Sequence, residues 1–270
     1  MTKPQSDSSF TTDVARFYES SLVPLIFQPY AADLAARAQI HEPNALLEIA
    51  CGTGVVTRVL ADVLPSACTI EATDLNEAMV SHAESLGTTR PVNWRQADVM
   101  SLPFEDDSFD VAVCQFAVMF FSDRVAAYRE VRRVLRPGGK FLFNVWRDIE
   151  ANEFADVVTQ AVGSLHPDNP PLFLTRTPYG HGSSVEIRTD VTAAGYEMCE
   201  LVQRDDISVA ASANDPATAF CQGTPLRNEI QERDADGLEL ATASAAAALE
   251  ARFGSGSIEG KISAIVVEAS

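Results

Sequence analysis

Positive charge is scarce in this chain. It has 20 Lys and Arg residues against 38 Asp and Glu residues, which gives a formal net charge of −18 at pH 7. Such a field repels a phosphate polymer, so we expect no nucleic-acid partner. One group of arginines has helical spacing, which is typical of the solvated face of a helix: Arg129, Arg132, Arg133 and Arg136.

Cysteine and histidine are also few. The five cysteines form no C-x-x-C pair and the four histidines are scattered, so the sequence predicts neither a disulfide framework nor a metal site. No apolar run approaches the roughly 18 residues of a membrane span. The first residues lack the basic-then-apolar layout of a signal peptide. We therefore expect a cytoplasmic protein with reduced cysteines and no membrane span.

What the chain does have is an alternation of apolar runs and amphipathic segments. Its 270 residues, 46% hydrophobic, suit one globular domain with additional segments. Strands are predicted over residues 45–50, 68–73, 92–97, 109–115 and 139–146. Helices are predicted over residues 54–64, 77–86 and 122–135, the last with Ser122 as N-cap. This alternation predicts a parallel sheet covered by helices on both faces.

The flanking segments follow other patterns. Residues 1–9 are predicted to be disordered, and two helices follow over 11–22 and 24–40, the second opened by Pro24. The second half predicts a helix, a loop, a helix, a strand, a broken helical stretch and a last strand, over residues 152–165, 167–183, 184–195, 197–207, 214–253 and 261–268.

Residues 46–54 form the most informative segment. An apolar run containing Glu48 ends in a turn of small residues with Gly52 and Gly54. The run is typical of a buried parallel strand, and the glycines let the backbone pass close to a ligand. Asp74 lies 20 residues after Gly54, where an acid can accept hydrogen bonds from a ribose diol. The pattern therefore predicts a nucleoside-binding strand–turn–helix–strand unit.

Two kinds of nucleoside ligand compete for this unit. A dinucleotide fingerprint needs a third glycine, and Thr57 occupies that position. Glu48 lies ahead of the glycines, where its carboxylate would repel a pyrophosphate but suit an ammonium or sulfonium. The residues thus favour a cationic ligand group over a dinucleotide.

Five short motifs occur in order between about residues 45 and 146. They are Glu48-x-Ala50-x-Gly52-x-Gly54, Asp74 with its neighbours, and the segments 96–99, 102–111 and 133–139. With these motifs the chain resembles the class I S-adenosylmethionine (SAM)-dependent methyltransferases, in their small-molecule, ubiquinone/menaquinone-biosynthesis-like (type 11) branch. Ala50 replaces the first glycine of the family loop. The resemblance implies an α/β, Rossmann-like fold: a mostly parallel seven-stranded sheet with helices on both faces, N-terminal helices and a helical insertion near the C-terminus.

The resemblance also implies where SAM binds. Glu48 would lie near the methionine part, Asp74 at the ribose and Asp98 at the adenine amino group. Leu75 and Val99 would enclose the adenine ring. The other expected cofactor contacts are Ala50, Cys51, Gly52, Thr53, Gly54, Met79, Gln115 and Phe116.

An acceptor pocket is predicted beside the cofactor. Its expected residues are aromatic and come from the N-terminal helices and the strand ends: Tyr18, Phe27, Tyr30, Phe120 and Trp146. A packing role alone is the alternative for the N-terminal set. We expect residues 1–40 to form a lid and residues 41–270 the SAM-binding domain, with the insertion at about 208–258. His181 is either a catalytic base or an exposed loop residue.

The expected activity is methyl transfer by direct displacement to O, N or C of a small, partly apolar molecule. No metal is required, and the chain is expected to be a monomer or homodimer. Two alternatives stay open: an NAD(P)-dependent oxidoreductase and a non-catalytic SAM-binding scaffold. A nucleic-acid or protein methyltransferase signature is missing, because residues 114–117 read Cys-Gln-Phe-Ala.

Overall fold

The computed structural model describes residues 16–270. The predicted disorder of residues 1–9 and the beginning of the predicted helix 11–22 lie outside the described residues.

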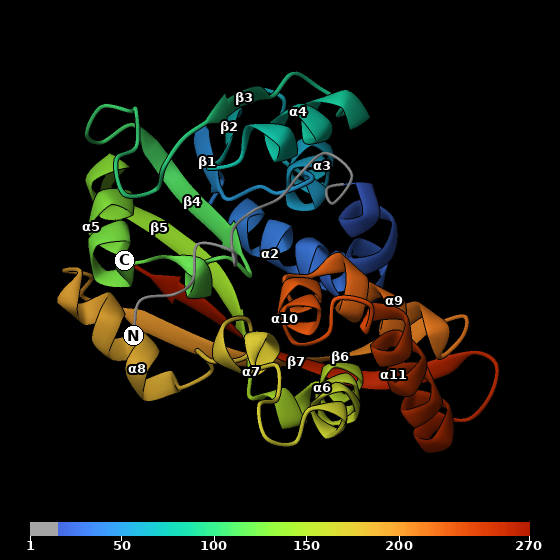
Figure 1. Ribbon diagram of the computed structural model, residues 1–270. Helices are drawn as coiled ribbons and strands as arrows, with labels where there is room; N and C mark the ends of the chain where they lie inside the picture. The colour runs from blue at the N-terminus through green and yellow to red at the C-terminus, as the bar shows by residue number, and fades with distance from the viewer. Residues whose placement is uncertain (1–15) are drawn as a thin grey trace.

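A seven-stranded sheet forms the centre of the molecule (Figure 1). Its strands are β1 (Ala45–Ile49), β2 (Thr69–Asp74), β3 (Asn93–Gln96), β4 (Phe109–Gln115), β5 (Leu135–Trp146), β6 (Cys199–Ala210) and β7 (Ile258–Ala269). The strand order is β3-β2-β1-β4-β5-β7-β6. The first five strands are parallel, and β7 runs antiparallel between β5 and β6. The Rossmann-like, mostly parallel sheet predicted from the sequence is confirmed.

Helical segments precede, connect and follow the strands. They are η2 (Tyr18–Phe27), α2 (Gln28–Ile40), α3 (Val55–Val63), α4 (Glu77–Leu86), η3 (Val118–Phe120), α5 (Arg124–Val134), η4 (Ile149–Ala151), α6 (Glu153–Leu165), α7 (Phe173–Arg176), α8 (Ser184–Ala193), α9 (Asn214–Gly223), α10 (Leu226–Arg233) and α11 (Leu238–Phe253).

Both faces of the sheet are covered, which explains the continuous apolar runs. Adjacent residues of β1 belong to different core clusters. Leu46 packs with residues of α2 and α3, including Leu34 and Leu60. Leu47 belongs to the cluster on the other face, with Tyr128 of α5. The central strand β1 therefore buries both rows of its side chains, whereas the edge strands β3 and β6 stay largely exposed.

The strand order reverses direction at β1. Leu47 of β1 pairs with Ala112 of β4, while Glu48 pairs with Ala72 of β2. In such sheets ligands bind in the crevice outside the carboxyl ends of the strands at this reversal. The glycine loop, Asp74 and Gln115 all stand at those ends.

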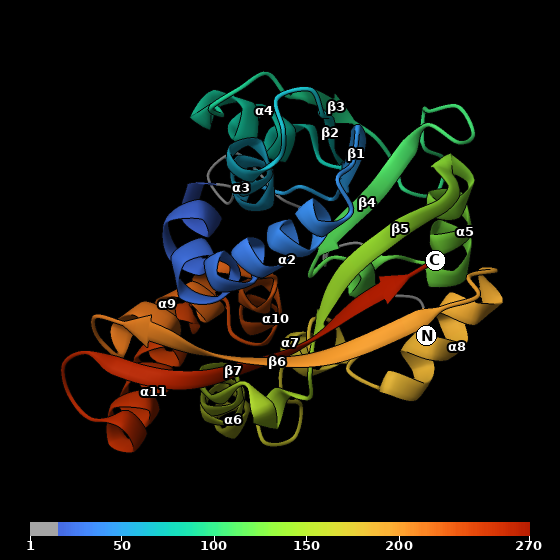
Figure 2. The same cartoon turned by 180° about the vertical axis from the view of Figure 1, so that it is seen from behind.

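The last two strands form a long hairpin with a helical insertion at its end. β6 and β7 pair over twelve residues each, from Cys199↔Ala269 to Ala210↔Ile258. The chain between them forms α9, α10 and α11 (Figures 1 and 2). Both views place α9 and α11 at the end of the hairpin farther from the C-terminus.

The N-terminal helices begin at other residues than the sequence predicted. Pro24 lies inside η2 and does not open α2; Pro29 occupies the first turn of α2 instead. The amide of Gln28 donates to the carbonyl of Val23, five residues earlier, so η2 is a π-helix. This wider winding accommodates Pro24, whose ring conflicts with normal α-helical packing.

Two further local predictions were wrong. Asp123, not Ser122, caps α5, because its Oδ1 accepts from the amide of Ala126 at 2.9 Å. The region 167–183, predicted as a loop, contains the short helix α7. The first error shifts the N-cap of α5 by one residue, which is within the usual uncertainty of helix boundaries. The second concerns a short helix inside a Pro-rich connection.

Candidate functional site: a cavity with a nucleoside end and an aromatic end

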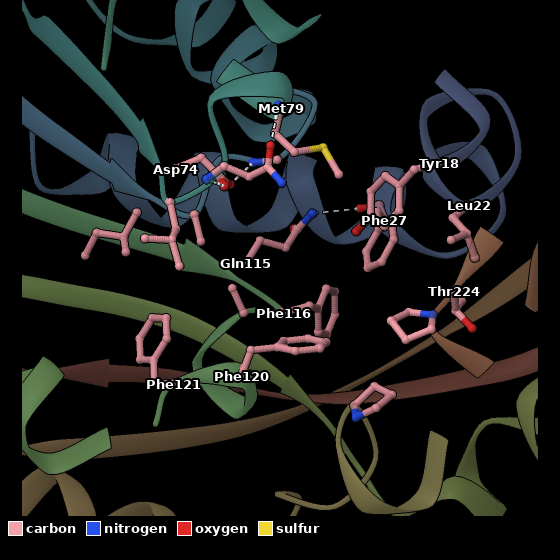
Figure 3. Close-up of a pocket in the computed structure, with 18 of the residues that line it drawn as sticks. Tyr18, Leu22, Phe27, Asp74, Met79, Gln115, Phe116, Phe120, Phe121 and Thr224 are labelled. Atoms are coloured by element: carbon pink, nitrogen blue, oxygen red, sulfur yellow. Dashed lines mark hydrogen bonds between the residues drawn. The ribbon is translucent and has the colours of Figure 1, made fainter. Parts of the chain in front are cut away.

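A cavity of about 470 Å³ opens at the carboxyl ends of β1, β2 and β4. Residues that follow these strands line one end. Aromatic residues from η2, from the loops after β4 and β5, and from the insertion line the other. Figure 3 shows Asp74 and Met79 on one side, Phe116 and Phe120 on the other, and Gln115 between them.

The loop after β1 turns through residues with positive φ. Ala50 has φ 53°, Gly52 55° and Gly54 82°. A Cβ added to Gly52 would meet nothing within 4 Å, so this glycine leaves cavity space open. A Cβ at Gly54 would lie 3.1 Å from the Cβ of Ala83 and 3.2 Å from the ring of Trp94. Gly52 thus permits a ligand to approach, whereas Gly54 permits α3 to pack.

Asp74 fixes the nucleoside end of the cavity. Its Oδ2 accepts from the amide of Gly52 at 2.9 Å, and its Oδ1 accepts from the amide of Asn76 at 2.8 Å. Burial raises the pKa of this carboxyl, and the two amide hydrogen bonds oppose that shift. Each carboxylate oxygen has two lone pairs, so each retains one acceptor position.

Apolar surface and one more acid complete this end. Leu75 is 58% exposed, which is unusual for a leucine, and it lines the cavity with Val99 and Met79. Asp98 lines it too, with Oδ1 accepting from the amide of Met100 at 2.9 Å. The structure therefore brings together the residues predicted at the adenine and ribose.

Glu48 is buried and does not line the cavity. Only 2% of it is exposed, and its Oε2 has no hydrogen-bond partner among the described residues. Burial raises the pKa of this carboxyl to about 8, an effect that neighbouring Thr57 and Arg58 oppose. The predicted contacts Cys51, Thr53 and Gly54 likewise lie outside the described lining, while Ala50 and Gly52 belong to it.

Nine aromatic side chains line the other end of the cavity. They are Tyr18, Phe27, Phe116, Phe120, Phe121, Trp146, Phe173, Tyr179 and Phe220. The rings of Phe116 and Trp146 stack at 3.7 Å with an interplanar angle of 3°. Phe27 tilts against both, and Tyr18 stacks on Phe27 at 5.1 Å. These four rings form a continuous aromatic wall.

The backbone of Phe116 is held in a strained conformation. Its φ is 50°, a region that side chains with a Cβ rarely adopt. Its amide donates to both the carbonyl oxygen and the Oδ1 of Asn144, at 3.2 and 2.9 Å. Asn144 is 1% exposed on β5, so a buried side chain fixes this part of the wall.

Tyr30, predicted in the acceptor pocket, lies behind the wall. It is fully buried, meets Phe116 and Trp146 edge-on, and donates through its hydroxyl to the carbonyl of Arg204. It is not among the described lining residues. Its contacts with Phe116, Trp146 and the backbone of Arg204 hold the ring in the core instead. The other four predicted acceptor residues do line the cavity.

Sequence reasoning missed the contribution of distant segments. Phe173 comes from α7, Tyr179 from the loop before α8, and Phe220 and Thr224 from α9 and the link to α10. No motif marks these residues. The break at Gly223-Thr224-Pro225 is visible in the sequence, but nothing local says that it faces the cofactor loop.

His181 takes neither of its predicted places. It is 3% exposed, so it is no exposed loop residue, and it is not among the described lining residues. Its Nδ1 lies 3.8 Å from Glu186 and its Nε2 4.0 Å from Asp190. It is therefore a buried imidazole beside two acids of α8.

Gln115 lies between the two ends of the cavity. Its Nε2 donates to the carbonyl of Phe27 at 3.3 Å, which ties β4 to the end of η2. Its Oε1 has no hydrogen-bond partner among the described residues. The amide is thus available to a bound molecule.

The described part of the cavity lining has no positive side chain. Among residues 16–270, no Lys, Arg or His lines it, and its carboxylates are those of Asp74 and Asp98. Any charge of the lining is therefore negative.

The structure defines a Rossmann-like fold with a cavity at the carboxyl ends of its strands and an aromatic pocket attached to it. Comparison with known proteins specifies the class further. Residues 47–143 match the family described as "Methyltransferase domain". The ubiquinone/menaquinone biosynthesis C-methyltransferase UbiE of Stenotrophomonas maltophilia is 25% identical over 204 residues, 70% of this chain and 81% of that protein.

Other relatives agree. The malonyl-[acyl-carrier protein] O-methyltransferase of Geobacter sulfurreducens is 30% identical over 173 residues, 62% of this chain and 60% of that protein. The chain spans between 23% and 81% of the length of the first curated relatives it matches. The crystal structure of YcgJ from Bacillus subtilis covers 89% of this chain and 97% of its own, with a TM-score of 0.57 and 21% identity, a likeness of fold.

Residues 47–143 therefore match a methyltransferase domain, and the relatives and the fold support a SAM-dependent methyltransferase of the small-molecule type, with SAM as the implied cofactor. No helix within residues 16–270 combines the length and the apolarity needed to cross a membrane.

Proposed function

We propose that this protein transfers the methyl group of SAM to a small, uncharged, largely apolar molecule. One observation carries the proposal: a single cavity joins a nucleoside-type end, built around Asp74, to an aromatic end. A cofactor and an acceptor in these two ends would meet near Gln115.

The residues at the first end suit SAM. The two acceptor positions left on Asp74 match the two hydroxyls of a ribose. The exposed side chain of Leu75, with Val99, offers apolar surface for an adenine. Glu48 lies buried outside the cavity lining, so no direct contact with SAM is proposed for it.

SAM supplies an activated methyl group on a cationic sulfur. What remains for the protein is to hold the acceptor in line with that methyl group and to exclude water. Tyr18 and Phe27 of η2, with the Thr224 link of the insertion, cover the cavity opposite the strand ends. We propose that the N-terminal segment, residues 1–40, acts as the lid.

The lining determines which acceptors are suitable. A carboxylate or phosphate on the acceptor would be buried with no positive partner among the described residues, which costs several kcal/mol. The two named curated relatives are a C- and an O-methyltransferase, so relatedness leaves the atom open. The cavity itself favours an uncharged acceptor.

Calorimetric titration tests the cofactor part of the proposal. SAM and S-adenosylhomocysteine should bind with micromolar dissociation constants, and NAD and NADP should not. Asp74→Ala should abolish binding of both adenosyl compounds. Retained affinity in that variant would show that the ribose assignment is wrong.

Asp110→Ala is the matched control. Asp110 also accepts two backbone amides, from Asn44 and Ala45 at 2.8 and 2.9 Å, but it stands at the opposite ends of the strands. Its loss should lower the melting temperature without changing the affinity for SAM. A fall in affinity equal to that of Asp74→Ala would attribute both effects to folding.

A further inference from the structure

We propose that the acceptor is a hydrophobic amine and that the aromatic end of the cavity favours the cation formed when its nitrogen is methylated. This inference rests on the proposed function and narrows it to one class of acceptor.

The first argument is the missing base. An oxygen or carbon nucleophile attacks best as an anion, which requires a base to form it and positive charge to stabilise it. No Lys, Arg or His belongs to the described lining, and its two carboxylates, Asp74 and Asp98, stand at the other end of the cavity. Burial raises the pKa of the Tyr18 and Tyr179 phenols far above the ordinary value, so both stay protonated. A neutral amine carries its own lone pair and needs no such help.

The second argument is the aromatic wall. The wall consists of four rings that all line the cavity, and each ring contacts the next in the order Tyr18, Phe27, Phe116 and Trp146. The faces of aromatic rings attract alkylammonium groups electrostatically. The acids at the other end, Asp74 and Asp98, and a net charge of −18 act in the same direction. The field is therefore suited to a cation and opposed to an anion.

The charges balance in this reaction. The nitrogen lone pair forms the new N–C bond as the S–C bond breaks, and that bonding pair stays on sulfur. Sulfur becomes a neutral thioether, and nitrogen gains the positive charge. A tertiary amine ends as a quaternary ammonium; a primary or secondary amine releases its proton to water afterwards.

The test compares isosteric ligands that differ in charge. Phenyltrimethylammonium and tert-butylbenzene have the same shape, and 4-methylbenzoate supplies an anion of similar size. Each is titrated into the protein saturated with S-adenosylhomocysteine. We expect the cation to bind about tenfold more tightly than its neutral isostere, and the anion to bind least. Equal or tighter binding of the neutral or anionic compound would overturn the inference.

Tryptophan fluorescence provides the second readout. The chain has two tryptophans, and Trp94 of β3 is outside the described lining. In Trp94→Phe the remaining emission reports on Trp146, so the cation should quench it. Phe27→Leu should reduce the preference for the cation while the neutral isostere still binds. An unchanged preference would contradict a role for the wall.

Failure of the two proposals can be told apart. If S-adenosylhomocysteine does not bind, the proposed function fails and the acceptor class with it. If it binds and an assay with labelled SAM methylates phenols or carboxylic acids faster than N,N-dimethylaniline, which is neutral at pH 7.5, only the amine inference is wrong.

Discussion

Gly52 and Gly54 stand two residues apart in the same loop, yet their surroundings assign them different roles. Gly52→Ala should cost about 1–2 kcal/mol of stability, because φ is 55° but the added Cβ meets no neighbour. The new methyl group enters the cavity, so the dissociation constant for SAM should rise at least about tenfold. Chemical denaturation and calorimetry measure the two effects.

Gly54→Ala should destabilise the fold more than Gly52→Ala does. Here the Cβ meets Ala83 and Trp94 at 3.1 and 3.2 Å in addition to a φ of 82°. We expect a loss of about 2–4 kcal/mol of stability. If Gly54→Ala were the milder of the two for folding, the division of roles between the glycines would be wrong.

Glu48 should make the stability of the free protein depend on pH. Its pKa is about 8 in the folded protein against an ordinary 4.5, because burial favours the neutral acid. The folded state therefore binds this proton more tightly than the unfolded state. Its contribution is fully present below about pH 4.5 and is lost as pH rises through 8. Between those limits the unfolding free energy should fall by roughly 2–5 kcal/mol from this group.

Glu48→Gln should abolish this decrease of the unfolding free energy with rising pH. Denaturation of the SAM-free protein at several pH values between 5 and 9 measures it. Glu84→Gln, an exposed change on α4, is the control and should leave the pH profile unchanged. Parallel profiles for wild type and Glu48→Gln would show that the carboxyl is ionised throughout.

At the level of elements, one arginine connects η2 to the loop that follows β1. Arg58 of α3 forms an ion pair with Glu19 of η2 at 2.6 Å and donates to the carbonyl of Thr53 at 2.7 Å. The other oxygen of Glu19 is buried without a hydrogen-bond partner among the described residues. The ion pair between Arg58 and Glu19 therefore helps to position η2 and, with it, Tyr18.

Arg58→Met should loosen η2 more than it destabilises the fold. The pair is partly exposed, so its loss should cost at most about 1 kcal/mol. Amide hydrogen exchange in η2 should nevertheless accelerate several-fold, since Glu19 is left half-buried and unpaired. Arg37→Met is the control, because Arg37 pairs with Asp33 inside α2 at 2.8 Å. Equal rates of amide exchange in η2 in both variants would show that Arg58 does not hold this helix.

The sheet could be predicted from the sequence because its signals are local. The central strands β1 and β4 are largely apolar runs, and the helix α3 between strands has apolar residues at helical spacing. Asp74 and the glycines follow strand ends, so their position at the crevice follows from topology alone. Asn76 likewise caps α4 through its own side chain, which accepts from the amides of Ala78 and Met79.

The lid and the insertion could not be predicted in detail, because tertiary contacts decide their geometry. Pro24 tolerates a π-helical turn that no local rule anticipates. A Cβ on Gly223 would lie 2.7 Å from the ring of Phe17, so α9 fits against the N-terminal segment some 200 residues away in sequence. Aromatic residues such as Phe220 reach the cavity only through that packing.

At the scale of the whole molecule, the excess of acidic side chains affects stability by long-range electrostatic repulsion rather than by individual contacts. With a net charge of −18 at pH 7, the negative side chains repel one another in the folded state and destabilise it. Raising the ionic strength from 0.01 to 0.15 M shortens the Debye length from about 30 Å to about 8 Å.

Salt should therefore stabilise the protein at neutral pH. We expect a gain of about 1 kcal/mol, or roughly 2–4 °C in melting temperature, between these ionic strengths at pH 7.5. Near pH 4.5, the isoelectric point, the gain should vanish because the net charge does. Calorimetric melting in KCl at both pH values measures it. A melting temperature that falls with salt at pH 7.5 would mean that specific ion pairs, such as Arg204 with Asp33 and Asp206, outweigh the repulsion.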